Sequence, residues 1–350
     1  MDVRLSSEQE ALRDTVTQAV ERLGPRTVLD LDDAERAARL DVALEQAGVR
    51  ELRTADEDGA PLTSAVEPAL VAEALARGLA DAPFLGPTLA TELRRLAGAD
   101  SVGSAETVAL TRDLGAPAVA DGVVLPTRSV AFDAAGALAS LVLVRDPAGY
   151  TLATAEVAAV RGNAAATSGI DLTRPTVRLE PAGLAPVEGA GVITEEQVTA
   201  WTAFGLALAS AELVGIMDGA VMLARDYAIG RSQYGAPIGS YQAVQHLIAD
   251  AYVLLEGSRS AALHAAWAVD AMPPAQALTA AAIAKAYAAR AARQVVETCI
   301  QVHGGIGNTW ECFVHVHLRR ALFDSSLFGD EGEVLAEIAT RHMGFDRGLR

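Results

Sequence analysis

The chain has 350 residues, of which 51% are hydrophobic and 5% aromatic, so Ala, Leu and Val must form most of its core. Its formal net charge of −17 excludes the basic footprint that binds nucleic acids and anionic membranes, which argues against both as partners. Cys299 and Cys312 are too few for a disulfide framework and match no metal-ligand spacing, so we expect small core residues in a cytoplasmic protein.

The first hundred residues carry the periodicity of helices. Ser7 and Glu10 have the spacing of a capping box, and apolar residues recur behind them at helical intervals. Three more helices are expected at residues 33–47, at residues 64–79 and from Pro87 onward. These patterns predict an N-terminal helical domain over residues 1–100.

Short apolar runs separated by turn residues follow this helical part. The expected strands are residues 107–110, 123–125, 129–132, 141–144 and 176–179. Several short strands with turn signals between them are typical of a small barrel or sandwich. We therefore expect a shortened β-barrel domain over residues 101–190.

Helices return after residue 190, and Thr194 is expected to cap the first of them. Residues 203–224 are long and apolar enough to raise the question of a membrane span. Glu212 and Asp218 lie within them, which favours a buried helix of a bundle. The remaining helices are expected at residues 274–302, 318–328 and 333–342.

The Ala-rich helix over residues 274–302 should place Lys285, Arg290 and Arg293 on an exposed face. With its neighbours it predicts a C-terminal four-helix-bundle domain over residues 191–350. The predicted fold class is therefore α+β, mainly α, with a helical domain, a small β-barrel and a helical bundle in chain order.

Residues 231–246 read RSQYGAPIGSYQAVQH and form a loop between two of the expected helices, with Gly and Pro as breakers. A planar Arg231 guanidinium beside the amides of Gln233 and Gln242 can bind a diphosphate in a fixed orientation. An aromatic such as Tyr234 offers a flat face to a nucleobase. The alternative is a solvated turn between helices.

Two stretches together resemble the acyl-CoA dehydrogenase family. The loop and the Ala249-Asp250 pair after it match the family's RxQFGxPI and FQAxxHxxAD patterns. The stretch from Gln301 through Gly304 and Gly305 is similar to the family's QxxGGxGxxxE segment. Residues 74–90, ALARGLADAPFLGPTLA, are similar to its N-terminal helical domain.

The resemblance implies a dehydrogenation in which a carboxylate removes a proton α to a CoA thioester while a hydride passes from the β carbon to FAD. The family's base is most often a Glu before a Gly, and Phe328 occupies that position here. In some members the base lies on the long helix instead, where this chain has Gly205. The flavin-contacting TEP strand is replaced by Thr111-Arg112-Asp113. No catalytic residue therefore stands at a family position.

A relocated base is the alternative. Glu212 lies two turns past Gly205 in an apolar helix, where burial would raise its pKa as a general base needs. A structural pair with a residue such as Arg259 is the other interpretation. Glu331 and Glu333 lie nearer to the lost base, but capping of the final helix explains them as well.

The resemblance also implies which half of a shared FAD site this chain retains and which half it lacks. In the family each FAD lies across a subunit interface: one subunit holds the flavin and supplies the base, and its neighbour holds the diphosphate and adenosine. This chain keeps the neighbour's set. We call the following the half-site residues: Arg231, Gln233, Tyr234, Gln242, Gln301, Gly304 and Gly305.

We therefore expect a subunit of an α2β2 acyl-CoA dehydrogenase, paired with a catalytically complete homologue and passing electrons to an electron-transfer flavoprotein. Such shortened subunits resemble those of the two-component dehydrogenases that actinobacteria use on steroid side-chain CoA thioesters. Two alternatives remain open. One is a self-sufficient homo-oligomeric dehydrogenase that uses Glu212 or Glu331, and the other is a flavin-free scaffold or acyl-carrier-binding module.

Overall fold

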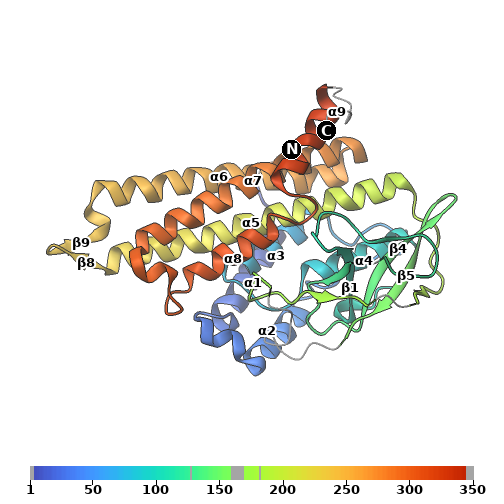
Figure 1. The fold of residues 1–350 in the computed structure, drawn as a ribbon, viewed down its shortest axis with the longest axis horizontal. Helices are drawn as coiled ribbons and strands as arrows, with labels where there is room; N and C mark the ends of the chain where they lie inside the picture. Colours follow the sequence, from blue (N-terminus) through green and yellow to red (C-terminus); the bar gives the residue numbers. More distant parts are fainter. Residues whose placement is uncertain (1–3, 127, 159–168, 181–182, 344–350) are drawn as a thin grey trace.

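The computed structural model describes residues 4–126, 128–158, 169–180 and 183–343. Long helices run side by side along the molecule, and a sheet lies beside one end of them (Figure 1). The β8–β9 hairpin, formed by Ser232–Gln233 and Ala236–Pro237, projects from the opposite end. The chain therefore separates the sheet from the loop of residues 231–246 by the length of the bundle.

The N-terminal part is helical, as the sequence predicts. Its helices are α1 (Ser7–Leu23), the 3₁₀ helix η1 (Val28–Asp32), α2 (Ala34–Gln46), α3 (Val66–Arg77) and α4 (Leu85–Leu96). The first cap lies one residue earlier than predicted, because Ser6 and Gln9 form the capping box in place of Ser7 and Glu10. Helix α3 packs along α5, so this part of the chain shares its core with the bundle.

The middle of the chain forms one mixed sheet. Its strands are β1 (Glu106–Thr111), β2 (Val119–Ala120), β3 (Ser129–Phe132), β4 (Ala139–Asp146), β5 (Gly149–Glu156), β6 (Val177–Arg178) and β7 (Ala185–Pro186). The order is β6-β3-β1-β4-β5-β7, with β2 paired to β4. Strands β1 and β4 run parallel, whereas β4 and β5 form an antiparallel pair. Among the described strands, β6 lies at one edge of the sheet, paired with β3, and β7 lies at the other, paired with β5.

Two strand predictions need correction. Residues 123–125 form no strand; Val124 makes only an isolated bridge to Gly183. Strand β5, which pairs along its whole length with β4, was not predicted because its Thr- and Ala-rich sequence has weak apolar alternation.

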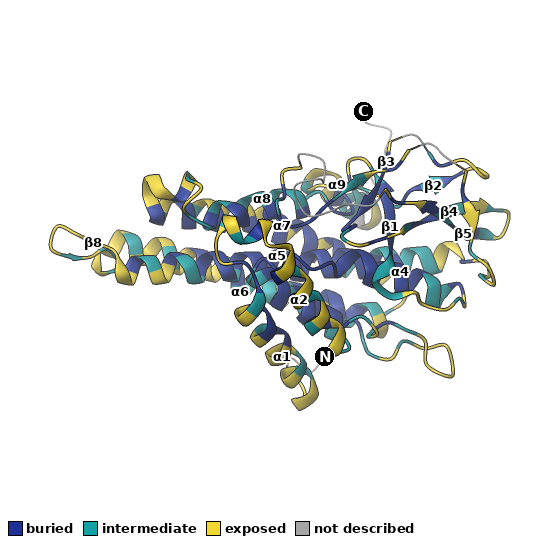
Figure 2. Ribbon diagram, turned by 90° about the horizontal axis from the view of Figure 1, so that it is seen from below, coloured by how far each residue is buried: buried dark blue, intermediate teal, exposed yellow. Residues whose placement is uncertain are grey.

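The C-terminal part is a helical bundle. It contains α5 (Glu195–Gly230), α6 (Gln242–Ala271), α7 (Pro274–His303), α8 (Val314–Asp324) and α9 (Glu331–Met343). Thr194 caps α5 through a capping box with Gln197, as predicted. Helix α5 is long and apolar enough to cross a membrane, but 83% of its apolar window is buried inside the structure. It is therefore the central helix of the core, and Figure 2 shows it in the buried colour along most of its length.

The face predicted for α7 is wrong at one position. Lys285 is 1% exposed, although Arg290 and Arg293 lie on the surface as predicted. Helix α8 begins at Val314 and ends at Asp324, earlier than the predicted residues 318–328. Phe328 therefore lies in the turn between α8 and α9 and not in a helix. The domain limits at residues 100 and 190 stay predictions.

Candidate functional site

The loop after α5 is a tight hairpin. Ser232 pairs with Pro237 and Gln233 with Ala236, and the two turn residues Tyr234 and Gly235 both have positive φ, 51° and 82°. A two-residue turn with positive φ at both positions is the type I′ hairpin, which normally carries Asn or Gly at the first position. Tyr234 is 97% exposed. The aromatic ring at the tip is therefore held in an unfavourable backbone conformation without packing against the rest of the described chain.

Two hydrogen bonds fix the base of this hairpin. The Tyr241 hydroxyl donates to the carbonyl of Gln233 at 2.9 Å, and the Gln245 amide donates to the carbonyl of Gly239 at 3.0 Å. The Gln242 amide faces His246 across one turn of α6, with 3.3 Å between their nitrogens. Tyr241 is therefore a structural residue of the loop, and the half-site residue Gln242 lies in the first turn of α6.

The second motif closes α7. Gln301 is exposed in the last turn, and Gly304 ends the helix with φ of 68°. A Cβ added at Gly304 or Gly305 would meet nothing within 4 Å, whereas one at Gly307 would lie 2.8 Å from the carbonyl oxygen of Ile300. Gly305 also lacks a positive φ. Nothing in the described chain requires glycine at position 305, which leaves room there for a ligand or a partner.

The structure brings the two motifs to the same end of the bundle. The Tyr227 ring in the last turns of α5 stacks on His303 at the end of α7, with centroids 4.6 Å apart. Figure 2 shows the β8 hairpin in the exposed colour, projecting beyond this end of the bundle. Within the described part of the chain, the side chains of Arg231 and Gln301 form no hydrogen bond and no ion pair. Donors that are exposed and unpaired in this way are available to an anion.

The family's two base positions face one another across a filled space. A Cβ added at Gly205 would lie 2.4 to 2.9 Å from three atoms of the Phe328 ring. The same ring packs edge-on against Trp201, with centroids 5.5 Å apart and an interplanar angle of 73°. Phe328 is 7% exposed. The position at which the resemblance predicts the family's carboxylate is therefore occupied by a buried phenyl ring.

Lys285 helps to hold the turn that presents Phe328. Its ammonium donates to the carbonyls of Ser325 at 2.9 Å and Gly329 at 3.2 Å, and burial lowers its pKa to about 8. The Phe328 amide donates to the carbonyl of Leu114, in the loop after β1, at 2.9 Å. No sequence pattern predicts this role, since a lone Lys in an Ala-rich helix is usually exposed.

Glu212 is a structural ion-pair residue, as one of the two interpretations has it, but Arg259 is not its partner and the raised pKa of the other interpretation is wrong. Its carboxylate accepts hydrogen bonds from Arg174 and Arg320, whereas Arg259 pairs with Glu73. Burial alone would raise the pKa of Glu212, but the two guanidinium charges lower it below its ordinary value. A carboxylate held between two arginines is a poor proton acceptor.

Asp324 is the second acidic side chain of this buried cluster. Burial, followed by the neighbouring charge of Glu212, raises the pKa of Asp324 well above its ordinary value. Arg174 reaches it at 2.8 Å. The cluster thus joins α5, α8 and the segment before β6, three parts of the chain that are far apart in sequence.

The other acidic candidates lie at the start of α9. Glu331 pairs with Arg290, whose Nε lies 2.7 Å from the carboxylate. Glu333 and Asp330 cap the helix, because each accepts a hydrogen bond from the backbone N–H of the other. Capping explains Glu333, as the sequence analysis proposed, and a surface ion pair explains Glu331.

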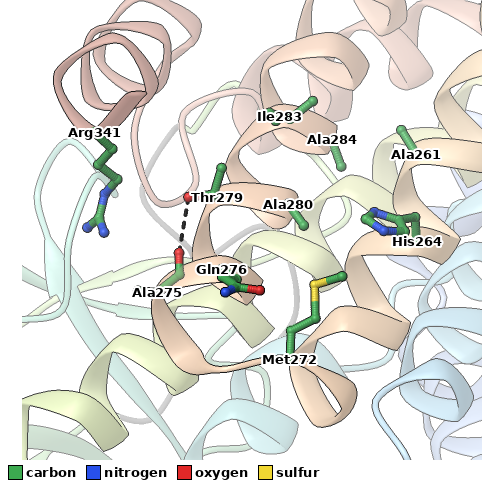
Figure 3. Close-up of a pocket in the computed structure, with 10 residues that line it drawn as sticks. All are labelled: Ala261, His264, Met272, Ala275, Gln276, Thr279, Ala280, Ile283, Ala284 and Arg341. Atoms are coloured by element: carbon green, nitrogen blue, oxygen red, sulfur yellow. Dashed lines mark hydrogen bonds between the residues drawn. The ribbon is translucent and has the colours of Figure 1, made fainter. Parts of the chain in front are cut away.

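A separate groove of about 720 Å³ lies near the turn between α6 and α7 (Figure 3). His264 and Met272 come from the α6 side, Gln276 and Ile283 from α7, and Arg341 approaches from α9. None of the half-site residues lines it. It is a distinct surface feature near the end of the bundle opposite the hairpin.

Comparison with known proteins decides the family. The family model for the acyl-CoA dehydrogenase C-terminal domain matches residues 199–344. Acyl-CoA dehydrogenase IpdE2 of Mycobacterium tuberculosis is 31% identical over 336 residues, which cover 95% of this chain and 96% of that protein. The chain belongs to the acyl-CoA dehydrogenase family. The family prediction made from the loop and glycine motifs is confirmed.

Solved structures confirm the predicted fold class of this acyl-CoA dehydrogenase family member. The Tcur3481-Tcur3483 steroid ACAD superposes with a TM-score of 0.78 at 22% identity, covering 95% of this chain and 96% of that one. The ChsE4-ChsE5 complex from Mycobacterium tuberculosis gives 0.76 at 22% identity, covering 99% and 100%. Butyryl-CoA dehydrogenase from Megasphaera elsdenii gives 0.75 at 18% identity, covering 98% and 100%.

Proposed function

We propose that this chain is a subunit of a FAD-dependent acyl-CoA dehydrogenase and that it supplies the diphosphate and adenosine half of a FAD site to a homologous partner. The partner carries the catalytic base and the flavin platform. The observation that carries the proposal is the contrast between two places in the structure. The half-site residues are exposed and ready for a ligand, whereas the base position is closed by Phe328.

The half-site residues fit the chemistry of FAD. The chain has 45 acidic and 28 basic side chains, yet Arg231 pairs with none of the described carboxylates. A guanidinium left free in an acidic protein suits a diphosphate, which it can bind in bidentate fashion. Gln233 and Gln301 would add amide donors, and the open backbone at Gly305 would let the cofactor approach closely. When bound, FAD supplies the hydride acceptor for the reaction.

A self-sufficient enzyme is the weaker alternative. It needs a carboxylate base beside the substrate, and Glu212 is instead committed to Arg174 and Arg320 with a lowered pKa. Glu331 is tied to Arg290. Glu212 therefore lacks the raised pKa that a general base requires at neutral pH, and the Glu331 carboxylate is occupied by its ion pair.

The substrate class that we propose is a steroid-derived acyl-CoA, with an electron-transfer flavoprotein as acceptor. The support is the nature of the similar proteins: one is a steroid ACAD, one is a complex of two different chains, and one is an electron-transferring flavoprotein. The proposed partner is accordingly a second, catalytically complete member of the same family in an α2β2 assembly.

Single-gene expression and co-expression with such a partner test the proposal. We expect the chain alone to carry no FAD, and the purified complex to carry one FAD per pair of unlike subunits. Flavin absorbance divided by protein concentration measures this ratio. A stable homotetramer of this chain that binds one FAD per subunit would contradict the heteromeric account.

A further inference from the structure

The backbone at Phe328 has a conformation that is unusual for a buried aromatic residue. Phe328 has φ of 57° and the following Gly329 has φ of 104°. A bulky residue rarely adopts positive φ, because its Cβ then crowds its own backbone. Such a conformation persists only where the surrounding structure holds it, and here Lys285 and Leu114 do so through three hydrogen bonds.

The helix opposite is shaped to receive the ring. Gly205 lies in the interior of a 36-residue helix, where glycine is unfavourable. Any larger residue there would overlap the Phe328 ring, since even a Cβ would come within 2.4 Å of it. Trp201, one turn earlier, supplies the wall, and its indole N–H is already used by the carbonyl of Leu89 at 2.9 Å. One requirement explains Gly205, the Phe328 ring and the strained backbone of the turn together: the ring must fill the space beside α5.

We infer that Phe328 is a steric plug that excludes an acyl chain from this subunit's own base region, so that each copy of this chain binds no acyl thioester there. The inference rests on the proposed function, because it assumes that the space between Gly205 and residue 328 corresponds to the place where a family member holds the acyl group. It goes beyond the proposed function because it attributes the loss of an acyl site in this chain to the bulk of the Phe328 ring as well as to the missing carboxylate. Removing the ring opens an apolar space, and its ligand class is an apolar acyl chain on CoA.

The surroundings support an apolar ligand. Leu327 and Phe204 are buried beside the same segments, and the polar groups of the turn are already paired with Lys285 and Leu114. The two acids considered as relocated bases are committed elsewhere, Glu212 to Arg174 and Arg320 and Glu331 to Arg290. An opened site would therefore bind a ligand without turning it over.

Binding stoichiometry tests the plug. The opening variant is Phe328→Gly, because glycine suits the positive φ and the turn then keeps its backbone. Phe328→Leu is the matched control, since it retains most of the bulk. The probe is decyl-CoA, a thioether that has no carbonyl and cannot be dehydrogenated, titrated into the co-expressed complex by calorimetry. Should Phe328→Gly fail to assemble, Phe328→Ala replaces it.

We expect the number of decyl-CoA sites to rise by one per copy of this chain in Phe328→Gly, and to be unchanged in Phe328→Leu. The inference is overturned if the assembled opening variant binds the same number as wild type, or if wild type already binds one decyl-CoA for every subunit of both kinds. Failure of the proposed function looks different: the two chains would not associate. The change per copy of this chain can then still be measured on this chain alone.

Discussion

Gly205→Ala should reveal how tightly the ring and the helix fit. The new methyl would lie 2.4 to 2.9 Å from three atoms of the Phe328 ring, closer than carbon atoms approach without displacement. Inserting a methyl into a packed site typically costs about 1 to 3 kcal/mol. Replacing glycine by alanine inside a helix contributes about 1 kcal/mol in the opposite direction. In wild type the net change should therefore be a loss of stability of between about 0 and 2 kcal/mol.

The same substitution made in Phe328→Ala should stabilise the protein by about 1 kcal/mol, because the ring is gone and only the helix preference remains. The coupling free energy between positions 205 and 328 is then about 1 to 3 kcal/mol. Urea unfolding midpoints of the four proteins measure it, and Gly230→Ala is the control, since a Cβ on this last residue of α5 would meet nothing within 4 Å. If Gly205→Ala has the same effect in both backgrounds, the two residues do not fit together as described.

Two further predictions concern buried charges. Glu212→Gln should lower the free energy of unfolding by about 3 to 5 kcal/mol, because Arg174 and Arg320 lose their shared counter-charge. Turnover per assembled complex should fall less than tenfold, whereas loss of a general base costs at least about a hundredfold. A collapse of turnover in an intact complex would therefore make Glu212 the base. Burial lowers the pKa of Lys285 to about 8, below its ordinary 10.5, so the unfolded chain binds that proton more tightly. As the pH rises from 8 to 10.5, wild type should therefore gain stability relative to Lys285→Met by about 1.4 kcal/mol per pH unit. If the unfolding midpoints of the two proteins change with pH in the same way, folding does not lower the pKa of Lys285.

Local signals in the sequence predict the parts of the fold that depend on neighbouring residues. Thr194 begins α5 because its hydroxyl accepts from Gln197 three residues later, and both residues are visible in the sequence. Strand β3 occupies Ser129–Phe132, the residues predicted for it. Shifts of one residue, as at Ser6 and Ser7, are the usual limit of such reasoning.

Contacts between distant segments could not be predicted. The pKa of Glu212 depends on Arg174 and Arg320, which lie 38 and 108 residues away, and no local pattern joins them. Lys285 was expected at the surface because its partners are carbonyls of the α8–α9 turn, which sequence cannot identify. These are tertiary effects, and they override local preference.

The half-site residues lie in two short motifs that are visible in the sequence, and their role in binding FAD stays a prediction. In the sequence, Gly205 and Phe328 are two separate positions at which the family's catalytic carboxylate is missing. The coordinates show that the Phe328 ring lies against Gly205, so that one substitution explains the other. Tyr234 likewise looks ordinary in the sequence, and only its positive φ and full exposure mark it.

The most direct test of the account is a titration of FAD into the apo complex of this chain with its partner, for wild type and for Arg231→Ala. A charge-assisted hydrogen bond contributes about 1.5 to 3 kcal/mol, so the variant should bind FAD about 10 to 100 times more weakly. Arg231→Lys should restore part of the affinity, because lysine keeps the charge but not the bidentate geometry. Arg225→Ala is the control, since Arg225 is exposed six residues earlier on α5 but pairs with Asp226. Equal FAD affinities of wild type and Arg231→Ala would contradict the claim that this chain contributes half of a shared FAD site.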